Sequence, residues 1–312
     1  MNRESSEISL SEGSSSKIQV SRHVPVLLNE VIEFLDLKPG KFIIDGTVNG
    51  GGHTEAILEK VSPGGKVLGI DWDEKVLEAT KKKFSKEKGI ILRQGNYADT
   101  LEILKKEKLG KAEGLLLDLG FSTEQIENSG RGFSFDKDEP LYMTYSDENI
   151  PVAQIIRELK EDELADVIFK LGGERLSRKI AKAIKDESKK RRIISSLELA
   201  EIIRNPVPKS YENGRIDPAT RTFQALRIYA NRELENLEKI LNSLTEILKP
   251  KARIAIIGFH SLEDAIVKKH FQKLEQEGIL KILTKKPIEP TKEEIEINPK
   301  SRSAKLRVAT II

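Results

Sequence analysis

The 312-residue chain contains no cysteine, only four histidines and few aromatic side chains, which make up 5% of its residues. Without cysteine it forms neither disulfides nor thiolate metal sites. The histidines are scattered without the spacing of metal ligands, so we expect no metal. No apolar run approaches the ~18 residues of a membrane span, so we expect no membrane contact. The scarcity of aromatics disfavours a broad stacking platform for single-stranded nucleic acid.

Charge is abundant but nearly balanced. Lys and Arg number 53 and Asp and Glu 50, which gives a net charge of +3, too small on its own to indicate a nucleic-acid partner. With 38% hydrophobic and 33% charged residues, the composition is that of a globular protein. Residues 1–22 are rich in serine and lack the basic and apolar segments of a signal peptide. We therefore expect a disordered tail there and a cytoplasmic protein.

Short apolar runs alternate with helical patterns from residue 23 to about 130. The runs at 42–44, 67–70 and 114–117 each end at an acid, Asp45, Asp71 and Asp118, and a fourth run lies at 90–92. This alternation is typical of βαβ units around a buried parallel sheet. Further strands are predicted at 253–259 and 306–312.

Residues 131–214 instead show mainly helical patterns. The sequence therefore predicts an α/β fold, with a doubly wound, Rossmann-like sheet formed by residues 23–130 and 215–312 and an inserted helical domain at 131–214. The insert follows the fourth strand, at the carboxyl edge where open α/β sheets bind ligands.

Two helix signals follow the insert. One apolar stripe runs from Phe223 to Leu244 at helical spacing, which predicts one long helix. Ser261 and Asp264 resemble a capping pair that opens the next helix.

A glycine-rich turn joins the first strand to its helix. It reads DGTVNGGGH over residues 45–53, which is not the G-x-G-x-x-G pattern of nicotinamide dinucleotide sites. The glycines allow close approach of a ligand, and Asp71, at the end of the second strand, is suited to hydrogen-bond a ribose. Tyr97 follows the third strand and is placed to contact an adenine. Together these residues indicate S-adenosylmethionine; the alternative is a tight turn whose acids merely cap helices.

At these residues the sequence resembles the MraW-type family of bacterial S-adenosylmethionine-dependent methyltransferases. The motifs that carry the resemblance are HVPVLL at 23–28, GGH at 51–53, DLGFS at 118–122, RGFSF at 131–135, PATRTFQALR at 218–227, FHSLED at 259–264 and NPKSRS at 298–303. Any one of them could arise by chance, but all of them in this order are specific.

The resemblance implies a class I methyltransferase sheet and methylation of the exocyclic N4 of a cytidine in the decoding region of 16S ribosomal RNA, within the small ribosomal subunit or its precursor. It implies cofactor contacts at Gly51, Gly52, His53, Asp71, Tyr97, Asp118 and Gln125.

The chain departs from the family pattern in three places. Asn49 stands where the family usually has glycine, Thr123-Glu124 replaces Ser-Pro, and residues 142–146 read YMTYS instead of DMRMD. The alternatives that stay open are a non-catalytic RNA-binding relative, a methyltransferase with a different RNA target, and a small-molecule methyltransferase. The basic insert argues against the last of these.

Basic residues cluster between 175 and 192, where nine Lys and Arg meet only two acids. On a helix, Arg178, Lys182 and Lys185 share one face, which suits phosphate contacts; the alternative is an ordinary solvated face. The full set of predicted RNA-binding residues is Arg178, Lys182, Lys185, Arg221, Arg227, Lys300 and Arg302.

Methyl transfer to an amine whose lone pair is delocalised requires an acceptor for its N–H hydrogens. Asp118 and Ser122, which follow the fourth strand, and His260, which ends the fifth, are the catalytic candidates. For His260 the alternative is a structural role at the strand-to-helix turn.

Overall fold

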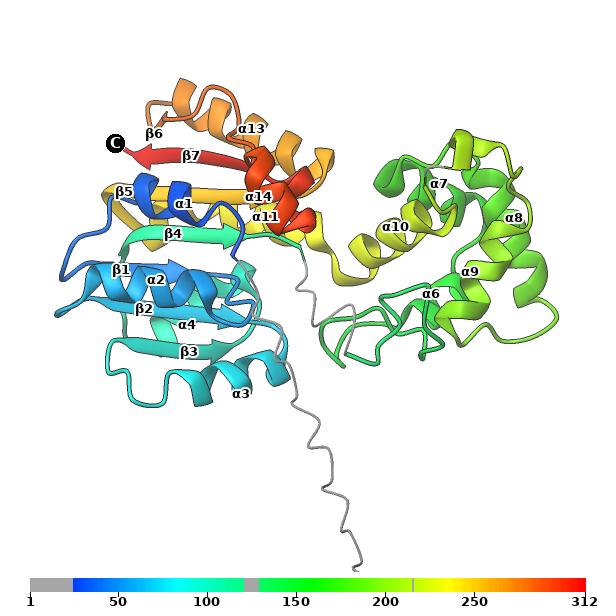
Figure 1. The fold of residues 1–312 in the computed structure, drawn as a ribbon, viewed down its shortest axis with the longest axis horizontal. Coiled ribbons are helices and arrows are strands. Elements are labelled where there is room, and N and C mark those ends of the chain that lie inside the picture. The colour runs from blue at the N-terminus through cyan, green and yellow to red at the C-terminus, as the bar shows by residue number, and fades with distance from the viewer. Residues whose placement is uncertain (1–24, 121–128, 215) are drawn as a thin grey trace, which may run out of the picture.

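The computed structural model describes residues 25–120, 129–214 and 216–312, so the predicted tail at 1–22 lies outside the described residues. Figure 1 shows a part built on a β-sheet and, beside it, a part built only of helices. Within the described ranges, no helix has the length and apolar character needed to cross a membrane.

In the described residues the sheet has seven strands in the order β3-β2-β1-β4-β5-β7-β6. Strands β1 to β5 pair in parallel, whereas β7 runs antiparallel to both β5 and β6. The bounds are β1 Phe42–Asp45, β2 Lys66–Asp71, β3 Ile90–Gln94, β4 Ala112–Asp118, β5 Leu248–Gly258, β6 Leu280–Ile282 and β7 Lys305–Ile311. The six predicted strands are confirmed, and the short β6 is an addition.

Both faces of the sheet are covered, as a doubly wound fold requires. Along β4, Leu115 and Leu117 pack into one apolar cluster and Leu116 into the other. This is why the strand reads as a continuous hydrophobic run. The helices that follow or cover the strands are α1 Leu28–Phe34, α2 Gly52–Val61, α3 Glu74–Lys83, α4 Thr100–Lys106, α11 Glu233–Asn242, α12 Leu244–Ile247, α13 Ser261–Gln276 and α14 Lys292–Ile297.

The helical part has a hydrophobic core of its own, formed by buried residues between Phe133 and Ala230. Its helices are α6 Val152–Glu158, α7 Glu161–Gly172, α8 Ser177–Ser188, α9 Ser196–Arg204 and α10 Ala219–Asn231. Helix α10 buries Phe223 and Leu226 in this core and lies with the other helices in Figure 1. The packing therefore favours a domain boundary after α10, rather than at residue 214.

The single long helix predicted from Phe223 to Leu244 is wrong. Arg232 adopts a left-handed conformation, with φ 51°, and separates α10 from α11. The apolar stripe continues across this break because α10 packs in the helical core and α11 packs against the sheet. The break brings Glu233, the first residue of α11, to the junction of the two parts.

Candidate cofactor and substrate site

An open pocket of about 560 Å³ lies where β1, β2 and β4 end. Asp71 and Tyr97, two of the predicted cofactor residues, line it. The remaining lining residues are Gly46, Thr47, Asn49, Trp72, Gly95, Asn96, Leu119, Gly120, Tyr145, Glu233, Asn236 and Glu263.

The glycine turn wraps one side of this pocket. Asn49, Gly50 and Gly51 have φ values of 46°, 85° and 81°, a left-handed run that asparagine tolerates better than most residues. A Cβ on Gly51 would lie 2.7 Å from Phe84, and one on Gly52 would lie 2.4 Å from Pro25. Gly51 and Gly52, both predicted cofactor contacts, are not among the pocket-lining residues. Glycine is needed at both positions because a side chain would clash with Phe84 or Pro25.

Asn49, the departure from the family pattern, has a defined role in the turn. Its backbone N–H donates to Asp71 Oδ2 at 2.9 Å, and its side-chain Nδ2 donates to the carbonyl oxygen of Asp118 at 3.3 Å. The side chain thus ties the turn to the end of β4. Asparagine here is compatible with the pocket and adds a cross-link that glycine cannot make.

Asp71 is buried at the end of β2. Its Oδ1 accepts the N–H of Asp73 and its Oδ2 accepts that of Asn49, each at 2.9 Å. Because a carboxylate oxygen has two lone pairs, each oxygen can still accept one more hydrogen bond. Burial raises the pKa of Asp71 to about 6, in spite of these backbone donors.

Two further carboxylates are buried at the ends of neighbouring strands. Burial raises the pKa of Asp45 to about 7, although Thr54 donates to its Oδ2 at 2.6 Å. Burial, together with the charges of Asp45 and Glu263, raises the pKa of Asp118 well above its usual value. Among the described residues, Asp118 Oδ1 has no hydrogen-bond partner. Several buried acids and one orphaned oxygen fit a cationic ligand with polar hydrogens, because such a ligand offsets the cost of ionising them.

His53, a predicted cofactor contact, is buried near the start of α2 and does not line the pocket. Its Nε2 lies 3.0 Å from the carbonyl oxygen of Val26, and its Nδ1 lies 3.7 Å from Asp118 Oδ2. His53 thus connects the segment before α1 to Asp118. Like Gly51 and Gly52, it supports the site from outside the pocket lining.

An aromatic wall closes the side of the pocket that faces the helical part. The ring of Tyr145 lies 5.9 Å from that of Trp72 and 5.3 Å from that of Phe133, and its hydroxyl donates to Glu233 Oε1 at 3.2 Å. Tyr145 belongs to the unusual 142–146 segment, so this departure forms part of the site. Trp72 follows Asp71 directly, and that adjacency is the one signal that could have identified it from the sequence.

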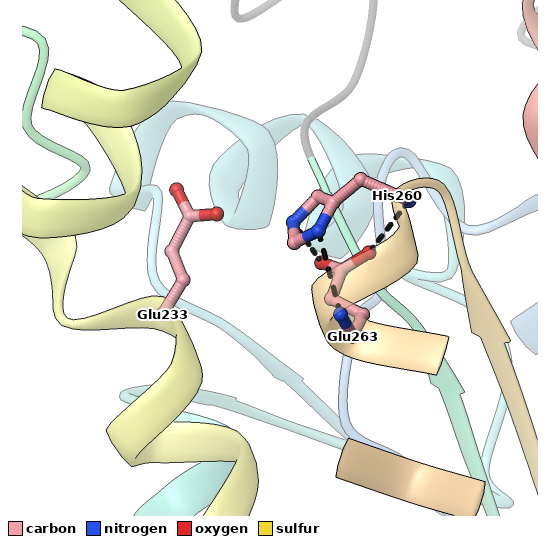
Figure 2. A group of neighbouring side chains, drawn as sticks. All are labelled: Glu233, His260 and Glu263. Carbon is pink, nitrogen blue, oxygen red and sulfur yellow. Dashed lines mark hydrogen bonds and ion pairs between the residues drawn. The ribbon is translucent and has the colours of Figure 1, made fainter. Parts of the chain in front are cut away.

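Figure 2 shows the neighbouring side chains of Glu233, His260 and Glu263. One ligand atom from each lies within 4.8 Å of the others, and Glu233 and Glu263 also line the pocket. A buried cation already serves this cluster: Arg227 Nε donates to Glu233 Oε1 at 2.8 Å. Burial opposes ionisation of Glu263, but the hydrogen bond and charge of His260 hold the pKa of Glu263 below its usual value. The geometry is that of an ion-pair network which joins the two parts of the chain.

His260 also begins helix α13. Its Nδ1 accepts the N–H of Glu263 at 3.4 Å, and Glu263 Oε2 accepts the N–H of His260 at 3.3 Å. The predicted capping pair of Ser261 and Asp264 is therefore wrong by one residue. Asp264 instead accepts two hydrogen bonds from Arg307, the shorter at 2.6 Å. Capping of α13 is the structural alternative considered for His260, and His260 does not line the pocket.

Two predicted residues, Ser122 and Gln125, lie in the segment 121–128, outside the described residues. Asp118, the remaining catalytic candidate, ends β4 beside Leu119 and Gly120, which do line the pocket.

The predicted RNA-binding residues fall into two groups. Arg178, Lys182, Lys300 and Arg302 have exposed side chains. By contrast, Lys185 Nζ donates to the carbonyl oxygens of three residues, Ile156, Arg157 and Leu159, and so caps the end of α6. Arg221 pairs with Glu212, and Arg227 pairs with Glu233.

Comparison with known proteins adds the family. Residues 20–312 match the family model of the MraW methylase family. The chain belongs to this family. A relative from Syntrophus aciditrophicus, named Ribosomal RNA small subunit methyltransferase H, is 42% identical over 308 residues, which are 93% of this chain and 97% of the relative. A relative of the same name from Thermotoga neapolitana is 44% identical over 296 residues, which are 93% and 96% of the two chains.

Solved structures also resemble the chain. An rRNA methylase from Streptococcus thermophilus has a TM-score of 0.43 and 10% identity, and the match covers 91% of this chain and 93% of that one. Fibrillarin from Aeropyrum pernix, in complex with S-adenosyl-L-methionine, has a TM-score of 0.38 and 11% identity, with coverage of 87% and 67%. Because these TM-scores are low, the fold is described from the chain's own sheet order. The activity is inferred from membership of the methylase family.

Proposed function

We propose that the chain transfers a methyl group from S-adenosylmethionine to the exocyclic N4 of a cytidine in the decoding region of 16S ribosomal RNA, within the small ribosomal subunit or its precursor. The observation that carries the proposal is the pocket at the carboxyl edge of the sheet, where Asp71 has free lone pairs beside the buried ends of β1 and β4. Membership of the MraW methylase family supports it. The substrate places the reaction in the cytoplasm.

Residues of this chain fit the parts of that cofactor. When bound, S-adenosylmethionine supplies an electrophilic methyl group on a cationic sulfonium. The free lone pairs of Asp71 suit ribose hydroxyls, and we assign the adenine contact to Tyr97, which lines the same pocket. Asp45 and Asp118 provide buried negative charge that favours a cation. Asn49, through its two hydrogen bonds, holds the turn against both Asp71 and the end of β4.

We assign the acceptor for the amine hydrogens to other residues that line the pocket. A cytosine amine is a weak nucleophile because its lone pair is delocalised into the ring, and an oxygen that accepts its N–H hydrogens localises that pair during transfer. Leu119 and Gly120, with their backbone carbonyls, and the carboxyl-bearing Glu233 and Glu263 all line the pocket. Asp118, which ends β4, remains a catalytic candidate, and so does Ser122, which lies outside the described residues. The target base must leave its stack to enter the pocket.

The test is methyl transfer from labelled S-adenosylmethionine to small ribosomal particles from cells that lack this protein, followed by mass spectrometry of the nucleosides. We expect N4-methylcytidine in the 16S RNA and no label on free nucleosides. A folded Asp71→Ala variant serves as the control and should transfer little label. Label on another nucleoside would indicate a different RNA target, and RNA binding without transfer would favour a non-catalytic relative.

A further inference from the structure

A second groove lies in the helical part, away from the cofactor pocket. It has a volume of about 740 Å³ and is lined by the start of α6, the end of α8 and the segments around Tyr142 and Ile194. Two apolar side chains in its wall are unusually open to solvent: Tyr142 is 44% exposed and Ile194 is 63% exposed. Exposed apolar side chains that line one groove indicate a binding site rather than a core.

Backbone hydrogen bonds hold this wall in place. The N–H of Leu141 donates to the carbonyl oxygen of Ile194 at 2.8 Å, and the N–H of Val152 donates to that of Tyr142 at 2.9 Å. The guanidinium of Arg131 lies 5.7 Å from the centre of the Tyr142 ring. The exposed ring is therefore positioned before any ligand binds, which lowers the entropy cost of binding.

The groove also carries positive charge. Arg157, Arg191 and Arg192 line it. Arg191 pairs with Glu187, whereas within the described ranges no ion pair engages the exposed side chains of Arg157 and Arg192. Two available guanidinium groups beside an open aromatic ring match a phosphate backbone and a base face.

One short segment connects the groove to the cofactor pocket. Tyr142 lines the groove and Tyr145 lines the pocket. Three peptide units separate them, so their Cα atoms lie within about 11 Å of each other. At ~3.4 Å for each stacked nucleotide, this upper limit corresponds to at most about three nucleotides.

We propose that this groove binds an unpaired nucleotide of the substrate RNA, close to the target base, with the base against Tyr142 and Ile194 and the phosphates at Arg157 and Arg192. The inference rests on the proposed function and adds a site within it. It also gives the unusual 142–146 segment a purpose: Tyr142 holds the RNA strand and Tyr145 shapes the cofactor pocket. One stacking side chain is sufficient here, so the site is compatible with the low aromatic content of the chain.

The experiment measures binding of a fluorescein-labelled single-stranded oligouridine, about twelve nucleotides long, by fluorescence anisotropy at several salt concentrations. Tyr142→Ala should weaken binding about five-fold or more, since base stacking contributes ~1–3 kcal/mol. Tyr142→Trp should retain wild-type affinity, and this separates loss of stacking from loss of fold. Replacing both Arg157 and Arg192 by alanine should make the slope of log K against log[salt] shallower by about 1.4, or ~0.7 for each phosphate contact.

Lys268→Ala is the matched control, because Lys268 is an exposed cation on α13 in the sheet part. It should leave both affinity and slope unchanged. If the Tyr142→Ala variant and the Arg157/Arg192 double variant both keep the wild-type affinity and slope, the proposal that the groove binds RNA is wrong. Methyl transfer to small ribosomal particles, measured in parallel, reports on the proposed function separately. If the wild type binds the oligonucleotide through the groove but labels no particle, the proposed function fails and the groove stands.

Discussion

Replacement of Asp71 by asparagine tests the cofactor site most locally. Both carboxylate oxygens of Asp71 accept a backbone N–H, from Asn49 and from Asp73, and each retains a lone pair for a ribose hydroxyl. Asparagine keeps the shape and one acceptor oxygen, but its NH₂ group can accept neither the second hydroxyl nor the backbone N–H that the replaced oxygen accepts. For the ligand, the hydrogen bond from that hydroxyl to a charged group is lost, at a cost of ~1.5–3 kcal/mol. We expect the Kd for S-adenosylmethionine to rise about 10- to 150-fold.

The pH dependence sharpens this prediction. Because burial raises the pKa of Asp71 to about 6, the wild-type side chain becomes protonated as the pH falls through 6 and loses acceptor capacity. Wild-type affinity should therefore decline below pH 6, and the Asp71→Asn variant should decline less. Isothermal titration calorimetry at pH 5 and 7.5 measures both effects.

The matched control is Asp73→Asn. Asp73 lies two residues further on and caps α3, where its Oδ1 accepts the N–H of Lys75 at 2.9 Å. Its replacement removes a neighbouring negative charge and retains a residue that can cap the helix, so affinity should stay within about two-fold. If Asp71→Asn, shown to be folded by its melting curve, binds as tightly as the wild type at both pH values, the ribose assignment is wrong.

Three further outcomes follow from the described contacts. Lys185→Met should lower the free energy of unfolding by about 1–3 kcal/mol in urea titrations, because three carbonyls lose a charged donor, while Lys182→Met should not. Arg227→Met should cost about 3–5 kcal/mol by leaving Glu233 without its buried cation, and Glu233→Gln in the same chain should recover part of this loss. Without ligand, stability at pH 5 should exceed that at pH 7.5, because folding raises the pKa of Asp45 to about 7 and the unfolded chain releases that proton near pH 4; Asp45→Asn should reduce this difference.

The sheet could be predicted because its signals are local. The inner parallel strands β1, β2 and β4 are buried on both faces and therefore read as apolar runs. The acids that end them, Asp45, Asp71 and Asp118, meet at one edge of the sheet. Their positions at and after strand ends predict Asp71 and Tyr97 near this edge, and both line the pocket. The break at residue 232 could not be predicted, because both helices that flank it continue the same apolar spacing.

The individual roles of charged residues depend on partners that are distant in the sequence. Lys185 and Arg178 share one face of α8 in the sequence pattern, yet Lys185 donates to carbonyls of α6 and of the residue that follows it, 26 to 29 positions away. The capping role of His260 shows only in the structure, where its Nδ1 accepts the N–H of Glu263. Tyr145 reaches the pocket because the helical part packs beside the sheet, a contact that no periodicity encodes.

The measurement that tests the central proposal most directly is mass spectrometry of nucleosides from 16S ribosomal RNA of three strains, one with this protein, one without it and one with the Asp71→Asn variant in its place. The proposal predicts N4-methylcytidine at the decoding region in the first strain, its absence in the second and a reduced level in the third. Equal N4-methylcytidine in the first two strains would contradict it.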